Sequence, residues 1–149
     1  MAEAEPITFL ILDVARMIRQ RFEDELGVAG LGITAGEART LLWAGRSPGL
    51  RQTALAEKLG VEPMTLVGFL DRLEAAGLAR RAPDPADRRA KLVYPTTAAL
   101  PMIEKIDAIA LAVRRIATAD LGERQGEVVR SSLARMRGAL SAEAKASAA

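Results

Sequence analysis

The stretch from Leu50 to Thr96 constrains the fold more than any other, because two helical patterns, a tight turn and a basic hairpin follow one another there. Gly60 ends the first helical pattern, where the left-handed conformation of a helix end favours glycine. Pro63 begins the second pattern, since the first turn of a helix does not need its N–H. The sequence therefore predicts two helices joined by a short turn, as in a helix-turn-helix. An ordinary helical hairpin in an all-α core is the alternative.

The second of these helical patterns has one apolar face and one face of small and polar residues. The apolar face repeats at spacings of four, three and four residues, through Leu66, Leu70, Leu73 and Gly77. The outer face near the N-terminus is small enough to enter a major groove about 12 Å wide. Thr65 and the helix N-terminal amides suit a phosphate contact, and Met64 or Val67 suits a thymine methyl. A solvated face without a partner is the alternative.

Two short strand patterns follow the second helix, at Leu78–Arg81 and Lys91–Tyr94. The prolines and aspartates of residues 82–89 favour a turn between them. From Leu78 to Tyr94 five basic residues outnumber two acidic ones by three, whereas the whole chain carries only +2. Such local positive charge is typical of a phosphate contact, with a solvated charge run as the alternative. The order helix, turn, helix, hairpin predicts a winged helix-turn-helix that binds double-stranded DNA.

Long helical patterns flank this region. Thr34 and Glu37 form a capping-box pattern that predicts the start of a helix. Apolar stripes predict further helices on both sides, one of them with a heptad-like repeat. The predicted helices span about residues 7–26, 35–45, 97–118 and 123–140. In the last helix we expect the apolar residues to face inward, namely Val129, Leu133, Met136 and Leu140.

The run from Leu55 to Thr96 resembles the MarR family of bacterial transcriptional regulators. The matching pieces are LAEKLGV, DRLEAAGL and DPADRR, and the last is the most specific because the family carries a D-x-R element at the wing. The resemblance implies that Arg89 enters the minor groove and that Asp87 braces it, in keeping with the attraction of a narrow groove for arginine. It also implies a phosphate contact for Arg88. Gly68 departs from the family, since many relatives have an arginine there.

Taken together, these observations predict a set of residues at the DNA interface. The set is Gln52, Thr53, Pro63, Met64, Thr65, Val67, Gly68, Arg72, Arg80, Arg81, Asp87, Arg88 and Arg89.

The terminal helices carry more apolar surface than a winged helix needs to cover itself. Internal core is one explanation, and the resemblance implies another, a homodimer that intertwines these helices. A twofold dimer presents two recognition helices about 34 Å apart and reads a pseudo-palindromic DNA site. The expected parts are an N-terminal dimerisation helix in residues 1–33, the winged helix-turn-helix in 34–96, C-terminal dimerisation helices in 97–140 and a disordered tail in 141–149. Met1 to Glu5 is also expected to be disordered. The predicted fold class is mainly α, with a small β-hairpin wing.

MarR relatives often bind small aromatic acids between the dimer helices and the winged region. The resemblance therefore implies a small-molecule effector site, for which the candidates are Arg16, Leu42, Trp43 and Arg46. A core tryptophan and a surface arginine are the alternatives. Such a ligand would act only if it binds unequally to the two protein conformations that have different half-site spacings.

The chain has no cysteine and no histidine. This composition excludes disulfides, thiolate metal sites, the usual zinc sites and histidine acid–base chemistry. We expect no metal and no cofactor. No apolar run is long enough to span a membrane, and Met1 to Pro6 lacks the basic start of a signal peptide, so we expect a cytoplasmic protein without a membrane partner.

The leading hypothesis is a sequence-specific, DNA-binding transcriptional regulator, acting as a dimeric repressor that a small, for example aromatic, ligand releases. The alternative is an architectural or protein-interaction winged-helix protein with little sequence specificity. An enzyme is the third class, and we do not expect one, because the sequence shows neither a Gly-rich phosphate loop nor a G-x-S-x-G motif.

Overall fold

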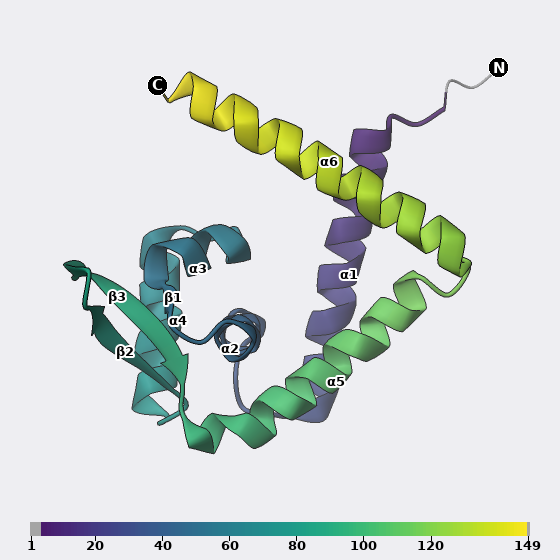
Figure 1. Cartoon of the computed structure of the whole chain (residues 1–149). Coiled ribbons are helices and arrows are strands. Elements are labelled where there is room, and N and C mark those ends of the chain that lie inside the picture. Colours follow the sequence, from purple (N-terminus) through teal and green to yellow (C-terminus); the bar gives the residue numbers. More distant parts are fainter. Residues whose placement is uncertain (1–3, 149) are drawn as a thin grey trace. The chain divides into compact units, whose positions relative to one another are not determined.

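The chain divides into two compact units, Met1–Val113 and Arg114–Ala149, and the computed structural model describes residues 4–148 of them (Figure 1). The elements in order are α1 (Ile7–Ala29), α2 (Ala35–Arg46), β1 (Leu50–Arg51), α3 (Gln52–Leu59), α4 (Pro63–Ala75), β2 (Ala79–Asp84), β3 (Asp87–Pro95), the 3-10 helix η1 (Thr97–Ala99), α5 (Leu100–Ala117) and α6 (Glu123–Ser147). The predicted fold class, mainly α with a small hairpin wing, is confirmed. No helix within residues 4–148 is long and apolar enough to cross a membrane.

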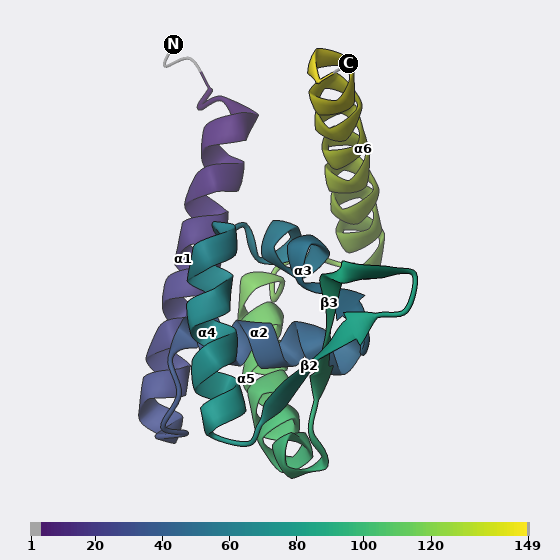
Figure 2. The ribbon, with the colours of Figure 1, turned by 90° about the vertical axis from the view of Figure 1, so that its left-hand side faces the viewer.

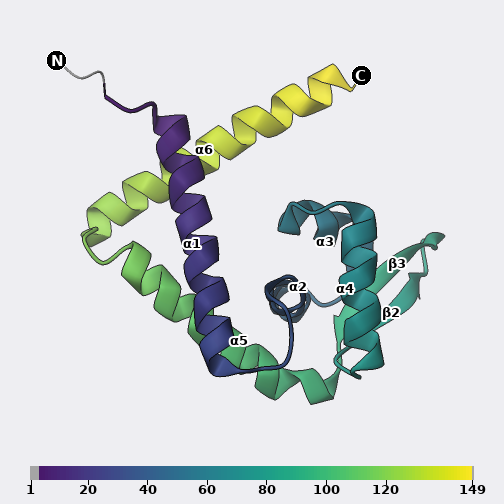
Figure 3. The ribbon, with the colours of Figure 1, turned by 180° about the vertical axis from the view of Figure 1, so that it is seen from behind.

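Helix α2 lies at the centre of the first unit, between α1 and the α3–α4 pair (Figures 1 and 3). One face of α2 contributes Leu41 to a core shared with α1, α4 and α5. The other face contributes Ala44 to a core shared with α3, α4 and β3. Because both cores include side chains of α4, packing against α2 fixes the position of that helix.

The helix-turn-helix prediction is confirmed in detail. Gly60 has φ 64° and ψ 38°, and its N–H donates to the carbonyls of Ala56 and Glu57 at the end of α3. Pro63 occupies the first turn of α4. The apolar face of α4 is buried through Leu66, Leu70 and Leu73. Gly77 does not belong to that face: it follows the helix in a turn with φ 71°, so this part of the prediction was wrong.

Helices α2 and α4 approach closely at one glycine. A Cβ added to Gly36 would lie 2.2 Å from Cζ of Phe69, a separation that real Cβ atoms do not show. The Phe69 ring therefore packs directly on the backbone of α2. The start of α2 is stabilised by the predicted capping box: the Glu37 N–H donates to Thr34 Oγ1 at 3.2 Å, and the Thr34 N–H donates to Glu37 Oε2 at 3.0 Å.

The hairpin strands are longer than the sequence predicted. Together with β1 the two hairpin strands form an antiparallel sheet in the order β1-β3-β2. Asp84 of β2 is paired with Asp87 of β3 across the turn. The predicted turn over residues 82–89 thus shrinks to two residues, and Arg88 and Arg89 belong to β3. Pro83 is tolerated because β2 is an edge strand, where a missing N–H costs no ladder hydrogen bond. Strand β1 was not predicted, since two residues carry no periodic pattern.

The first and last helices also extend beyond their predicted ends. Helix α1 continues through Gly27 to Ala29 and ends at Gly30, which has φ 61°. Helix α6 continues to Ser147, so residues 141–147 do not form the disordered tail that the sequence predicted. This segment is rich in alanine, the strongest helix former, and contains neither glycine nor proline. Residues 1–3 and 149, also expected to be disordered, lie outside the described residues.

The two C-terminal helices differ in burial. The heptad-like face of α5 joins the core of the first unit through Ile106 and Val113. Within α6, every residue of which is described, no side chain is buried. Leu133 is 43% exposed and Leu140 73%. The expectation that the apolar residues of α6 face inward is therefore wrong for the single chain.

Candidate nucleic-acid interface

Helix α4 and the β2–β3 hairpin lie side by side on one face of the first unit (Figure 2). The N-terminal turn of α4 is open to solvent: Pro63, Met64 and Thr65 are exposed, and Met64 retains 77% of its accessible surface. Val67 and Gly68 are half-buried. The backbone N–H groups and side chains of this turn are therefore accessible, as a recognition helix requires.

The start of α3 carries two further residues that the sequence predicts to contact DNA. Thr53 is exposed and Gln52 is half-buried. The side-chain oxygen of Gln52 is buried and has no hydrogen-bond partner among the described residues. Of these two predicted DNA contacts, Thr53 is therefore the more accessible to solvent.

The tip of the hairpin carries the predicted pair of Asp87 and Arg89. Asp87 Oδ1 accepts from the backbone N–H of Arg89 at 3.1 Å and lies 3.4 Å from its Nε. The Arg89 side chain is 94% exposed, and Arg88 is exposed beside it. Asp87 thus contacts Arg89 without covering it, which leaves the guanidinium free for a partner.

A second ion pair, which the sequence did not reveal, holds the hairpin to the helix-turn-helix. Arg51 lies at the end of β1, and its Nε donates to Asp84 Oδ2 at 2.7 Å. Its Nη2 lies 2.6 Å from the same oxygen in an ion pair. Asp84 Oδ1 accepts from the Ala86 N–H at 2.9 Å. The Ala86 N–H, with the Arg51 guanidinium, holds the pKa of Asp84 below its usual value despite burial. The two partners are 33 residues apart, so no local pattern could have paired them.

Arg81, predicted to contact DNA, is instead bonded to helix α4. Its Nη2 lies 2.5 Å from both Asp71 Oδ1 and Glu74 Oε2. Its backbone N–H donates to Glu74 Oε1 at 2.8 Å. The hydrogen bond to Glu74 is the main cause that raises the pKa of Arg81, and the same bond lowers the pKa of Glu74. The side chain is only 20% exposed, so Arg81 ties β2 to α4, and its contact with DNA stays a prediction.

Arg80 precedes Arg81 in β2, and successive side chains of a strand lie on opposite faces. It is exposed, and its guanidinium carbon lies 4.3 Å from the centroid of the Tyr94 ring on β3. Stacking on an aromatic face leaves the N–H donors of an arginine available. Of the two neighbouring arginines, Arg80 is therefore the one placed to contact phosphate.

Arg72 and Glu37 link the recognition helix to α2. Arg72 Nε donates to Glu37 Oε1. The Glu37 side chain is 7% exposed, whereas that of Arg72 is 57% exposed. Burial by itself raises the pKa of Glu37, but the hydrogen bonds from Arg72 and from Thr34 outweigh it and hold the pKa below its usual value. Glu37 is therefore ionised at neutral pH, and Arg72 keeps part of its surface free for another partner.

The four candidates for an effector site have separate environments. Arg16 is paired with Asp13 at 2.6 Å on an exposed part of α1, and it lines a shallow open pocket with Glu5, Phe9 and Leu12. Leu42 belongs to the core. Trp43 packs at the edge of the other core, with Lys58 Nζ 4.8 Å from its ring centroid. Arg46 is paired with Asp107 of α5 at 2.6 Å. An effector site formed by these residues stays a prediction.

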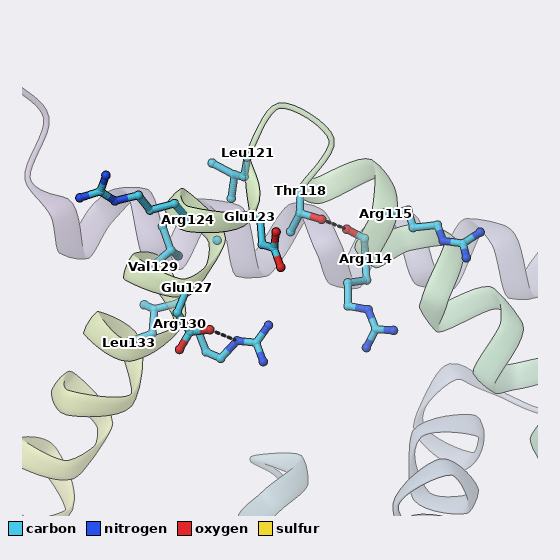
Figure 4. A pocket seen from close by; sticks show the side chains of 12 residues that line it. Arg114, Arg115, Thr118, Leu121, Glu123, Arg124, Glu127, Val129, Arg130 and Leu133 are labelled. Atoms are coloured by element: carbon cyan, nitrogen blue, oxygen red, sulfur yellow. Dashed lines mark hydrogen bonds and ion pairs between the residues drawn. The ribbon is translucent and has the colours of Figure 1, made fainter.

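A larger pocket, of about 960 Å³, lies in the second unit, at the bend between the end of α5 and the start of α6 (Figure 4). Arginines at its rim include Arg114 and Arg124, and Arg130 is paired with Glu127 at 3.6 Å. Val129 and Leu133 are apolar residues of its lining. None of the predicted site residues lines this pocket.

Comparison with known proteins gives one consistent result. The model of the MarR family matches residues 33–91. A solved structure described as the transcriptional regulator PA3341 is 31% identical, with 91% of this chain and 98% of that chain covered and a TM-score of 0.81. The crystal structure of MarR is 26% identical, with 96% of both chains covered and a TM-score of 0.76. A MarR-family regulator from Rhodococcus sp. RHA1 is 26% identical, with 85% and 89% covered and a TM-score of 0.73.

The fold and the exposed recognition helix with its basic wing define a DNA-binding transcriptional regulator of the winged helix-turn-helix class. Within that class, the chain belongs to the MarR family.

Proposed function

We propose that this regulator is a dimeric repressor that binds a pseudo-palindromic DNA site and is released by a small ligand. The N-terminal turn of α4 enters the major groove, and Arg89 enters the adjacent minor groove. The observation that carries this proposal is the wing tip, where Arg89 is 94% exposed and contacted by Asp87. A narrow minor groove has an enhanced negative potential, which attracts an arginine held in this way.

Exposed apolar side chains support the dimer. On α1 they include Phe9, Leu10, Leu12 and Met17, and on α6 they include Val129, Leu133 and Leu140. Burying apolar surface contributes roughly 25 cal/mol per Å², and large exposed apolar patches mark interaction sites. A second copy of the chain is the partner that would cover both helices at once in a symmetric assembly. In this proposal, residues 1–33 and 97–140 provide the dimerisation helices and residues 34–96 bind DNA.

The proposal is tested by titrating the protein into fluorescent duplexes and following their anisotropy. One duplex carries the DNA upstream of the protein's own coding region, and the other carries the same bases scrambled. Each titration is run at two salt concentrations, because phosphate contacts make affinity fall with salt. We expect tight, salt-sensitive binding to the upstream duplex and weak binding to the scrambled one. No binding to either duplex would refute the DNA-binding role of this surface.

An architectural protein with little sequence specificity is the second candidate. Gly68 favours it, since the middle of the recognition helix carries no side chain of its own there. Equal affinity for the upstream and scrambled duplexes would support this candidate. Release by a ligand is tested separately, by adding small aromatic acids to the specific complex. Loss of anisotropy with the specific duplex would support a ligand-released repressor.

A further inference from the structure

Gly68 has no side chain, and the guanidinium of Arg72 lies beside the position where one would project. A Cβ built on Gly68 would lie 3.6 Å from Arg72 Nη1, at ordinary contact distance. Arg72 is four residues further along the helix, and side chains of a helix lean toward its N-terminus. The Arg72 side chain thus runs back along α4 and places its end over the position where residue 68 would project.

Two groups hold the Arg72 side chain in this position. Its Nε donates to Glu37 Oε1, and its guanidinium carbon lies 5.6 Å from the centroid of the Phe69 ring. Both supports are themselves fixed. The other oxygen of Glu37 accepts from the Thr34 N–H at 3.0 Å, and Phe69 packs on the backbone of Gly36. The guanidinium is therefore held through its Nε edge, and 57% of the side chain remains exposed.

A guanidinium held in this way is suited to one base. Its two terminal nitrogens can donate together to O6 and N7 of guanine, which is the commonest specific arginine contact in the major groove. Holding a long side chain in its bound conformation before binding reduces the entropy lost on binding. We propose that Arg72, positioned by Glu37 and lying over Gly68, reads a guanine in each half-site in place of a side chain at position 68. This inference rests on the proposed sequence-specific binding of DNA by α4.

The test removes one acceptor at a time from the DNA. In the upstream duplex, each guanine is replaced in turn by 7-deazaguanine, which has a C–H in place of N7. For the wild-type protein we expect one guanine per half-site at which affinity falls by about 10- to 150-fold, the range for one hydrogen bond to a charged group. In Arg72→Met, which keeps an apolar stem but has no donors, we expect this sensitivity to vanish at that guanine and to persist at any others.

A matched pair at position 68 tests the geometry. In Gly68→Ala the added Cβ makes an ordinary contact with Arg72 Nη1, so the sensitivity to 7-deazaguanine should remain. Gly68→Leu fills the space that the guanidinium occupies, so the sensitivity should be lost. Circular dichroism and a thermal melt establish that both variants are folded. Loss in both variants, or in neither, would contradict the placement of Arg72 over this position.

Glu37→Gln tests the positioning role, with a change at an exposed residue of α5, Glu104→Gln, as the control. If Glu37 orients Arg72, the variant should lose discrimination at the same guanine while its salt dependence stays that of the wild type. An effect through general destabilisation would instead weaken binding to all duplexes alike, and that result would overturn the positioning role. If Arg72→Met keeps the wild-type profile on a specific site, the inference fails alone. If the wild-type protein binds the upstream and scrambled duplexes equally, the proposed function fails, and the inference with it.

Discussion

At the scale of single residues, Glu37 couples stability to pH. Its pKa in the folded protein lies below the usual 4.5. A group whose pKa is lowered by folding contributes stability above its unfolded pKa and loses it as pH falls through the folded value. Thermal melts at pH 7 and at stepwise lower pH should therefore show that the wild type loses more stability below about pH 4.5 than Glu37→Gln does. At pH 7 the variant should be less stable by roughly 1–3 kcal/mol, the cost of a broken hydrogen bond to a charged group. Parallel pH profiles for the two proteins would contradict this assignment.

The role that we propose for Arg89 lies in DNA binding and not in the stability of the fold. Because its side chain is 94% exposed, Arg89→Ala should leave the melting temperature unchanged. The same change should weaken binding to the specific duplex by about 1–3 kcal/mol, the typical cost of one specific arginine contact. Anisotropy titrations measure the loss, and Arg130→Ala on α6 is a control for removing an exposed positive charge. Equal affinity of Arg89→Ala and wild type would remove the wing tip from the interface.

At the scale of elements, two arginines hold the wing in place through ion pairs. Arg51 joins β1 to Asp84 at the tip-proximal end of β2, and Arg81 joins β2 to α4. Arg81→Met keeps the length of the side chain but leaves Glu74 without its partner. Urea denaturation should show a loss of about 1–3 kcal/mol, since Arg81 is 20% exposed and its bonds are charge-assisted. Arg80→Met on the same strand should cost less than about 1 kcal/mol, but should weaken binding to specific and random duplexes alike, as a phosphate contact does. The reverse ranking of stabilities would contradict the structural role of Arg81.

At the scale of the whole molecule, the exposed apolar face of α1 predicts self-association. Phe9 is 60% exposed and Leu12 68% exposed, near one end of the helix. A charge placed there would have to be desolvated at an interface, which is costly without a partner. Phe9→Glu should therefore lower the mass found by light scattering from that of a dimer to that of a monomer. Met64→Glu on α4 is the control, because Met64 is also an exposed apolar residue, at 77%, and lies outside the proposed dimerisation helices. A dimer mass for Phe9→Glu would place the interface elsewhere.

The local features of this protein were predictable from the sequence because each depends on neighbouring residues. The capping box of Thr34 and Glu37 and the left-handed Gly60 are set by backbone conformation within one turn. The buried face of α4 follows from its apolar spacing. The basic hairpin could be found for the same reason, although the lengths of its strands could not. Strand length depends on which residues pair across the hairpin, and pairing continued through Pro83 to Asp84.

The tertiary structure alone decided which charged groups meet. Glu37 and Arg72 are 35 residues apart, and Arg51 and Asp84 are 33 apart. A count of charge along the hairpin treats Arg80 and Arg81 alike, yet packing against α4 gives Arg81 two carboxylate partners and leaves Arg80 exposed. The amino-acid pattern was enough to predict the class of fold and to propose the surface that binds DNA. Only the packing of α2, α4 and the wing determined which arginines remain free there, because the Arg81 guanidinium is bonded to both Asp71 and Glu74, whereas Arg72 is held through Nε and stays 57% exposed.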